Sequence, residues 1–243
     1  MTLLERYTNR INEQFEKVET TQRDAIIAVG NMIAEKVKNG AAVHVFDSGH
    51  IINAELIGRG GGVFFLKRFM YHLDVTDDVR PRDRSGVSKD MTGLAAYALK
   101  ASNALPGDVI IIGSVSGRSE NVVDLAIEAK KFGLTVVAMT SLEYSKAVPS
   151  RHSSKKRLFE CADYVLDNCA PKAEGMLHVD GIEAPFAAAS GLSAALIMWS
   201  VCAQAIDRLL EMGVTPSVYK SDNFEDGPVY NQGQDRHYQE TGY

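Results

Sequence analysis

The 243-residue sequence contains few cysteines, and their spacing is irregular. Cys161, Cys169 and Cys202 are odd in number and form no C-x-x-C pair. Such a set argues against a disulfide framework or a zinc centre and is typical of a reducing compartment. We expect each cysteine to be a small buried apolar residue rather than a nucleophile.

An excess of positive charge and a long apolar run are missing too. The formal net charge is −5, which argues against non-specific binding to nucleic acid. No segment approaches 18 uninterrupted apolar residues, and the charged segment 1–17 contains no stretch of signal-peptide type. We therefore expect a cytoplasmic protein with neither a membrane nor a nucleic acid as its partner.

Two signatures of cofactor binding are also lacking. His, Cys, Asp and Glu residues do not recur with the regular spacing of a metal site. The G-x-G-x-x-G fingerprint of nicotinamide-binding domains does not follow the first expected strand. We expect a protein that needs no metal ion and no cofactor.

What the chain does contain is an alternation of apolar strand-like runs with amphipathic helical patterns. This alternation is typical of an α/β protein whose parallel sheet is covered on both faces. The patterns predict strands at 41–46, 63–75, 109–112, 134–141 and 164–170. They predict helices at 1–38, 51–60, 92–102, 119–132, 156–161 and 190–212.

Three segments fall outside this alternation. Residues 76–91 are polar and predict a loop, whereas residues 174–187 predict an irregular segment or a hairpin. The tail 214–243 is polar, and three aromatic residues are expected to dock it on the core: Tyr219, Phe224 and Tyr230.

Ligands of open parallel sheets bind beyond the carboxyl ends of the strands. That rule selects four loops, at 47–51, 113–119, 140–153 and 167–171. The last of them contains Asn168, which we include among the candidate ligand-binding residues.

The loop after the third strand has the composition of an anion-binding turn. Gly113 and Gly117 let the backbone approach a ligand closely, and hydroxyl donors come from Ser114, Ser116 and Ser119. Ser119 stands at the start of a predicted helix, where free N–H groups and the helix dipole favour an anion. A plain N-cap at Ser119 and a turn-forming role for Ser114 are the alternatives.

The loop "DSGH" repeats this arrangement after the first strand. Ser48 and Gly49 lie between a strand and a predicted helix, so they form a second polar edge of the same pocket. Two such loops at one edge of a sheet are hard to ascribe to turn formation alone, and the pair favours an anion site.

Several motifs resemble one known family. The pattern S-x-S-G-x-[ST] in "SVSGRSEN" looks like the phosphosugar-binding loop of SIS (sugar isomerase) domains. The stretches "VHVFDSGH", "TSLEYS", "SRHSSKKRLFECADYVLDNCAP" and "MGVTPSVYKSDNFEDGPVYN" are similar to a stand-alone branch of that family. The resemblance implies a three-layer αβα sandwich around a mostly parallel five-stranded sheet. It implies a single domain over 1–243, with N-terminal helices at 1–39, a core at 40–213 and a tail at 214–243.

The resemblance also implies an activity. SIS domains bind sugar phosphates, and the first expectation is an aldose–ketose isomerase that moves a proton through an enediol on a phosphorylated or otherwise anionic sugar. A sugar-phosphate sensor without turnover is one alternative, and an etherase or lyase is another. Asp47 replaces the glycine usual in the branch, and its carboxylate would repel a phosphate.

Proton transfer of this kind needs a carboxylate and a histidine. Glu55 matches the place of a glutamate that is often catalytic in SIS enzymes, and His50 and His152 are the candidates for ring opening. Arg151 suits an anionic group, while Arg118 is expected to face solvent.

An oligomer is expected as well, either a homodimer or a homotetramer. SIS sites commonly lie at subunit interfaces, and Glu183 is a candidate to reach the site of a neighbouring subunit. The apolar helix 190–212 has little polar face, which indicates either an oligomerisation surface or a buried core helix.

Overall fold

The computed structural model describes residues 1–49, 53–88 and 90–243, and its centre is a five-stranded sheet. The strands run in the order β2-β1-β3-β4-β5, and each neighbouring pair is parallel. Their bounds are Val43–Asp47 (β1), Leu66–Arg68 (β2), Val109–Gly113 (β3), Thr135–Thr140 (β4) and Tyr164–Asp167 (β5). The predicted α/β class with a five-stranded parallel sheet is confirmed.

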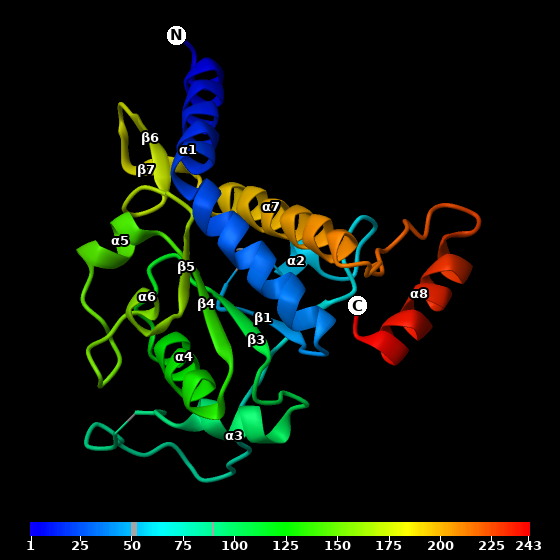
Figure 1. Cartoon of the computed structure of the whole chain (residues 1–243). Coiled ribbons are helices and arrows are strands. Elements are labelled where there is room, and N and C mark those ends of the chain that lie inside the picture. The colour runs from blue at the N-terminus through cyan, green and yellow to red at the C-terminus, as the bar shows by residue number, and fades with distance from the viewer. Residues whose placement is uncertain (50–52, 89) are drawn as a thin grey trace.

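Helices cover the sheet on both sides (Figure 1). Residues of β1 alternate between the two faces, so that Val43 and Val45 enter one core and Phe46 enters the other. The first core is closed by α1 (Leu3–Lys38), α2 (Asn53–Leu56) and α7 (Ser190–Glu211). The second is closed by α3 (Leu94–Ala101), α4 (Glu120–Phe132) and α6 (Leu158–Cys161). The three-layer αβα arrangement is therefore confirmed.

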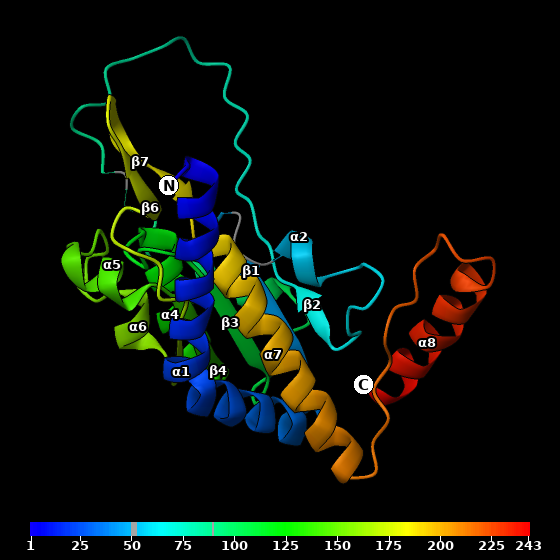
Figure 2. The ribbon, with the colours of Figure 1, turned by 90° about the horizontal axis from the view of Figure 1, so that it is seen from above.

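The N-terminal segment is one helix of 36 residues rather than several. It begins with a capping box, in which the Thr2 hydroxyl accepts from the Glu5 amide and the Glu5 carboxylate accepts from the Thr2 amide. It ends just before Gly40, whose φ of +85° terminates the helical path. From Gln14 onward α1 contributes buried residues, and it lies along α7 in both views (Figures 1 and 2).

Three predicted elements are shorter than their sequence patterns. The strand 63–75 is reduced to the three residues of β2, after which a long loop runs to Gly93. The helix 92–102 starts only after Gly93, whose φ is +95°, so Thr92 is not its cap. Within the described part of the helix predicted at 51–60, α2 ends at Leu56, and Gly58 and Gly61 with their positive φ angles do not continue the helical path.

Two helices were not predicted, and one hairpin was. Ser141 caps the short helix α5 (Leu142–Ala147) by accepting a hydrogen bond from the Tyr144 amide at 3.1 Å. The polar tail contains α8 (Gly227–Thr241), which stands beside the end of α7 in Figure 1. The hairpin expected at 174–187 is present as β6 (Gly175–Val179) and β7 (Ile182–Ala188).

One of the three predicted docking residues attaches the tail to the core. The Tyr219 ring stacks on the buried Phe64 with centroids 3.7 Å apart. Phe224 and Tyr230 are 63% and 42% exposed, and their rings flank the ammonium of Lys220 instead. The prediction for Phe224 and Tyr230 is therefore wrong, because each ring contacts its own tail.

The long helix α7 belongs to the core. By length and composition it could cross a membrane, but the core helices of globular proteins pass the same test. In this chain it packs along α1, and Ile197, Met198 and Ala205 are fully buried. One side of this helix is thus part of the core, and its role in an oligomer stays a prediction.

The three cysteines are free and buried, as predicted. Burial raises the pKa of the Cys202 thiol to about 12. Burial also raises the pKa values of Cys161 and Cys169. A nucleophile needs its thiolate form, so these residues act as small apolar side chains.

Candidate functional site

The four predicted loops meet at one edge of the sheet. The strands end at the same level, since Asp47 lies opposite Gly113, Gly113 opposite Met139, and Thr140 opposite Asp167. The loops that follow β1, β3, β4 and β5 are consequently neighbours at the carboxyl edge, which is the place where open parallel sheets bind ligands.

Hydrogen bonds join these loops to one another. The backbone amide and the hydroxyl of Ser48 both donate to the Gly113 carbonyl, at 3.0 and 3.1 Å. The Thr140 hydroxyl donates to the Val115 carbonyl at 2.9 Å, and the Asn168 amide donates to the Thr140 carbonyl at 2.9 Å. The Ser48 hydroxyl thus joins the first loop to the end of β3, and its place at a polar edge of the pocket stays a prediction.

The turn after β3 depends on Gly117, which has a φ of +56°. A Cβ atom at this position would lie 3.0 Å from Leu158 Cβ and 3.2 Å from the hydroxyl oxygens of Thr140 and Ser145. The Gly117 carbonyl also accepts a hydrogen bond from the Leu158 amide at 2.8 Å. Both the backbone angle and the space around it thus require glycine.

The serines of this turn lie at the start of α4. Ser119 occupies the N-cap position, but its side chain makes no capping hydrogen bond, so the side-chain cap offered as an alternative is not formed. Ser114 is buried, whereas Ser116 and Ser119 are half-buried. The first N–H groups of this 13-residue helix and its dipole favour an anion at the turn.

Buried polar atoms without a hydrogen-bond partner surround the turn. Among the residues that the structure describes there are four. Three are Arg118 Nε, Ser145 Oγ and Asn168 Nδ2, and the fourth is Nε2 of His152, in the same 140–153 loop as Ser145. Ser145 and Asn168 are completely buried. Leaving such a group unpaired costs about 1–3 kcal/mol, so this cluster indicates bound water or a ligand.

Arg118 and Ser145 were not predicted correctly from the sequence. Arg118 was expected to face solvent, but it is half-buried, and its carbonyl accepts a hydrogen bond from the Arg151 amide at 2.9 Å. The loop that contains Arg151 therefore lies against Arg118, and no local pattern in the sequence indicates this contact. Ser145 follows Ser141 by four residues within "TSLEYS", and this helical spacing was the available signal.

Glu55 lies on α2, directly after the first loop, and two side chains hold its carboxylate. One oxygen accepts from the Arg59 guanidinium one turn later, and the other accepts from the Trp199 indole of α7 at 3.3 Å. The side chain of Glu55 is still 44% exposed. The carboxylate is therefore oriented by neighbours while remaining accessible from solvent.

His152 lies in the loop between α5 and α6 and is 3% exposed. Its Nδ1 accepts from the Ser154 amide at 3.0 Å, and its Nε2 faces Asp124 of α4 at 3.9 Å. Asp124 in turn accepts hydrogen bonds from the Gly93 and Ala95 amides. This geometry favours a supporting role over contact with a sugar. His50, the other candidate for ring opening, lies outside the described residues.

Of the remaining candidates, Asp47 is half-buried, whereas Arg151 and Glu183 are exposed. The Asp47 carboxylate accepts from the Gly49 amide at 3.1 Å and thereby shapes the first loop. Arg151 is exposed beside the turn, and Glu183 is exposed on β7 of the hairpin. The hairpin stands beside the beginning of α1, so one chain does not bring Glu183 into the group of loops (Figure 1).

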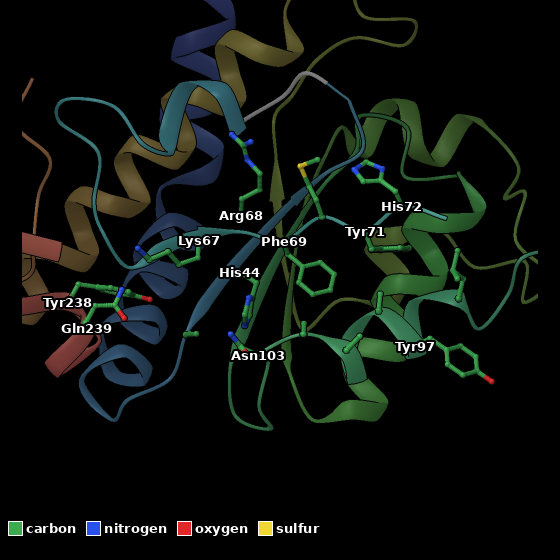
Figure 3. Close-up of a pocket in the computed structure, with 16 residues that line it drawn as sticks. His44, Lys67, Arg68, Phe69, Tyr71, His72, Tyr97, Asn103, Tyr238 and Gln239 are labelled. Atoms are coloured by element: carbon green, nitrogen blue, oxygen red, sulfur yellow. The ribbon is translucent and has the colours of Figure 1, made fainter. Parts of the chain in front are cut away.

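We also considered a metal site and a surface hollow in the rest of the described chain. Within residues 1–49, 53–88 and 90–243, no group of three His, Cys, Asp or Glu residues could hold a metal ion. A hollow of about 820 Å³ lies on a face of the sheet, and its lining shares no residue with the four loops (Figure 3). The carboxyl edge is thus the candidate site of the fold.

Comparison with known proteins assigns the chain to a family. Residues 6–141, more than half of the chain, match the family model described as SIS domain. The chain belongs to the SIS domain family. A UPF0309 protein of Geobacillus kaustophilus is 32% identical over 237 residues, which cover 95% of this chain and 92% of that protein.

Solved structures show the same fold for this SIS protein. A phosphoheptose isomerase from Francisella tularensis aligns with a TM-score of 0.51 at 18% identity, covering 84% of this chain and 98% of that one. A phosphoheptose isomerase from Neisseria gonorrhoeae aligns with a TM-score of 0.50 at 16% identity, covering 83% and 97%. The SIS fold predicted from the motifs is confirmed.

Proposed function

We propose that this SIS protein binds a phosphorylated or otherwise anionic sugar at the carboxyl edge of its sheet and interconverts its aldose and ketose forms. The turn around Gly117 carries the proposal, because it opens onto the start of α4 and is surrounded by buried polar atoms without partners. The two solved proteins of the same fold are phosphoheptose isomerases, which catalyse this class of reaction.

The anionic group would sit on the N-terminus of α4. Backbone N–H groups and the Ser116 and Ser119 hydroxyls would donate to its oxygens, and the Arg118 guanidinium would add charge-assisted hydrogen bonds. Asn168 Nδ2 and Ser145 Oγ are within the same edge and would bind water or ligand oxygens. Arg151, exposed beside the turn, would attract the anionic group with its positive charge.

Glu55 would transfer the proton. Its carboxylate would take the proton from C2 of the open-chain aldose, leaving an enediolate. The O2 proton would then pass to O1, and the carboxylate would return its proton to C1 to give the ketose. Trp199 and Arg59 hold the carboxylate in one orientation, which favours a defined approach to the substrate carbon. His50 would open the sugar ring by moving a proton to the ring oxygen.

A sensor without turnover is the second candidate. One observation favours it, namely that both Glu55 oxygens already accept hydrogen bonds in the structure. A carboxylate engaged in this way could serve to fix α2 against α7 rather than to move protons. Ligand binding would then be unchanged, but no isomer would form.

A second subunit would complete the site. Ile182 and Phe186 on β7 are 55% and 56% exposed, and Glu183 lies between them on the same strand. Large apolar side chains that share one exposed hairpin favour a protein contact. In such a dimer the hairpin would carry Glu183 toward the partner's loops.

The charge of Asp47 is expected to weaken phosphosugar binding. Asp47→Asn keeps the oxygen that accepts from the Gly49 amide but removes the negative charge. Unit charges 4 Å apart in water interact by about 1 kcal/mol, so affinity should rise by about fivefold. Isothermal titration calorimetry with the phosphosugar measures this change in affinity. Asp77→Asn is the matched control, since Asp77 accepts from the Val79 amide in the same kind of two-residue turn, outside the four loops of the site. Equal affinities for wild type and Asp47→Asn would contradict a place for Asp47 at the anion.

Thermal unfolding with a ligand panel tests the proposed binding function. The panel contains C4 to C7 sugar phosphates, sulfonated sugars and the same sugars without the anionic group. A ligand at a hundred times its dissociation constant adds about 2.7 kcal/mol of stability. We expect anionic sugars to raise the midpoint and their neutral counterparts to leave it unchanged. Stabilisation by neutral sugars alone, or by none of the panel, would contradict the proposed ligand class.

A further inference from the structure

Part of one sheet face is left uncovered by helices. On this face α4 and α6 pack against β3 and β4, whereas β1 and β2 border the hollow of about 820 Å³. Figure 3 shows its floor, formed by His44, Lys67 and Phe69, with α3 on one side and Tyr238 of α8 on the other. Parallel sheets are normally covered on both faces, so an uncovered area of this size indicates a binding surface.

The charge of this hollow is opposite to that of the whole chain. Two permanent cations, Lys67 and Arg68, line it together with His44 and His72, and no carboxylate does so among its described lining residues. The chain as a whole carries a formal charge of −5. Asp108, which lies outside the lining, is engaged by His44 at 3.1 Å, and two further carboxylates outside the lining, Asp235 and Asp124, act on Lys67 and Tyr71. The surface is therefore complementary to an anion.

Lys67 is a half-buried ammonium that lacks an ion pair within the described part of the chain. Its Nζ lies 3.7 Å from the centre of the Tyr238 ring and 5.3 Å from that of Phe64. Burial lowers the pKa of Lys67, and the carboxylate of Asp235 offsets this only in part. Ring faces stabilise a cation but accept few of its N–H bonds, so an anion here would gain strong hydrogen bonds.

Aromatic side chains form the rest of the surface. Phe69 packs edge-on against both His44 and Tyr71, with ring centroids 5.9 and 6.1 Å apart. Tyr71 stacks on Phe46, and burial raises the pKa of its phenol to about 12, so it remains a neutral hydrogen-bond donor. The amide of Asn103 lies at the same floor (Figure 3). A flat ring with polar edges fits such a surface better than a saturated sugar does.

We infer that this hollow is a second ligand site, which takes a planar aromatic ring carrying an anionic group, as in a nucleoside monophosphate. The ring would lie against Phe69 and Tyr71, and the phosphate would be drawn to Lys67 and Arg68. The site shares no lining residue with the carboxyl-edge loops, so it stands independently of the proposed isomerase function.

Titration calorimetry with AMP, adenosine and inorganic phosphate tests this inference on the full chain. We expect AMP to bind and each fragment to bind about tenfold more weakly or worse, because each lacks one of the two contacts. Lys67→Met should weaken AMP binding by about tenfold, since hydrogen bonds to a charged group contribute at that level. Lys100→Met is the matched control, because it removes the same charge from an α3 lysine outside the lining.

Arg68→Gln provides a second variant, since Arg68 is exposed and its replacement leaves the fold intact. It should also weaken AMP binding, and thermal unfolding of all variants verifies their folding. Absence of AMP binding at millimolar concentration would overturn the inference. So would AMP binding equal to that of phosphate alone, which would place the anion at the α4 turn, or binding unaffected by both Lys67→Met and Arg68→Gln.

Discussion

Glu55→Gln is expected to remove turnover and to leave sugar binding in place. The amide keeps the shape of the side chain and can still contact Trp199, but it cannot accept the C2 proton. Loss of a general base lowers the rate by about 10²- to 10⁴-fold. The dissociation constant of the sugar should change little, because the anion is held by the turn at α4. Steady-state kinetics and calorimetry on the same sample measure both quantities.

Glu211→Gln is the control for this substitution. Glu211 is also a helical glutamate paired with an arginine, Arg208, and it lies at the far end of α7. Its replacement should leave both turnover and binding unchanged. Full activity of Glu55→Gln would show that another group moves the proton, whereas lost binding would show that Glu55 contacts the ligand before any chemistry.

Gly117→Ala is expected to damage both stability and ligand binding. A residue with a side chain at a φ of +56° costs about 1–2 kcal/mol, and crowding against the buried Leu158 adds to it. We expect a loss of about 2–4 kcal/mol in the free energy of unfolding. The carbonyl of Gly117 also anchors Leu158, so the turn would move and affinity for sugar phosphate should fall by about tenfold or more.

Gly40→Ala separates these two causes. Gly40 also has a positive φ, +85°, but a Cβ there meets nothing within 4 Å. Denaturant unfolding should show a loss of about 1 kcal/mol for Gly40→Ala and no change in sugar affinity. Equal losses for both variants would mean that the space around Gly117 is not restrictive. Unchanged affinity in Gly117→Ala would mean that the turn does not hold the anion.

Much of the fold could be predicted from local patterns, because local interactions determine those parts. The helix at α4 runs from an N-cap serine to Gly133, whose φ of +98° ends it, and both signals are visible in the sequence. The buried strands β1, β3 and β4 appear as short runs of β-branched residues for the same reason. Their common carboxyl edge then follows from parallel pairing, and with it the neighbouring loops.

The rest depends on contacts between distant segments. The pattern at 63–75 is mostly apolar, yet β2 ends at Arg68, and beyond it Phe69 packs against Tyr71, which stacks on Phe46. Helix α8 has a polar sequence, and it is held by contacts such as that of Tyr238 with Lys67. Neither arrangement has a signal in the local periodicity.

The candidate site also has one part that local motifs predict and another part that depends on contacts between distant segments. The glycines and serines of the anion-binding turn were visible as a motif, whereas the burial of Arg118 and His152 was not. The loop 148–157, which contains His152, folds back against the turn through the hydrogen bond from the Arg151 amide to the Arg118 carbonyl. The spacing of residues along the sequence gives no information on such a contact between two loops.

The central claim is proton transfer on a bound anionic sugar, and proton NMR in D₂O tests it most directly. The protein is incubated with each sugar phosphate that raises its unfolding temperature. We expect an isomer to appear with deuterium at the carbon that received the proton, and Glu55→Gln to form none. Binding without any isomer or any deuterium incorporation would contradict the isomerase assignment and identify a sensor.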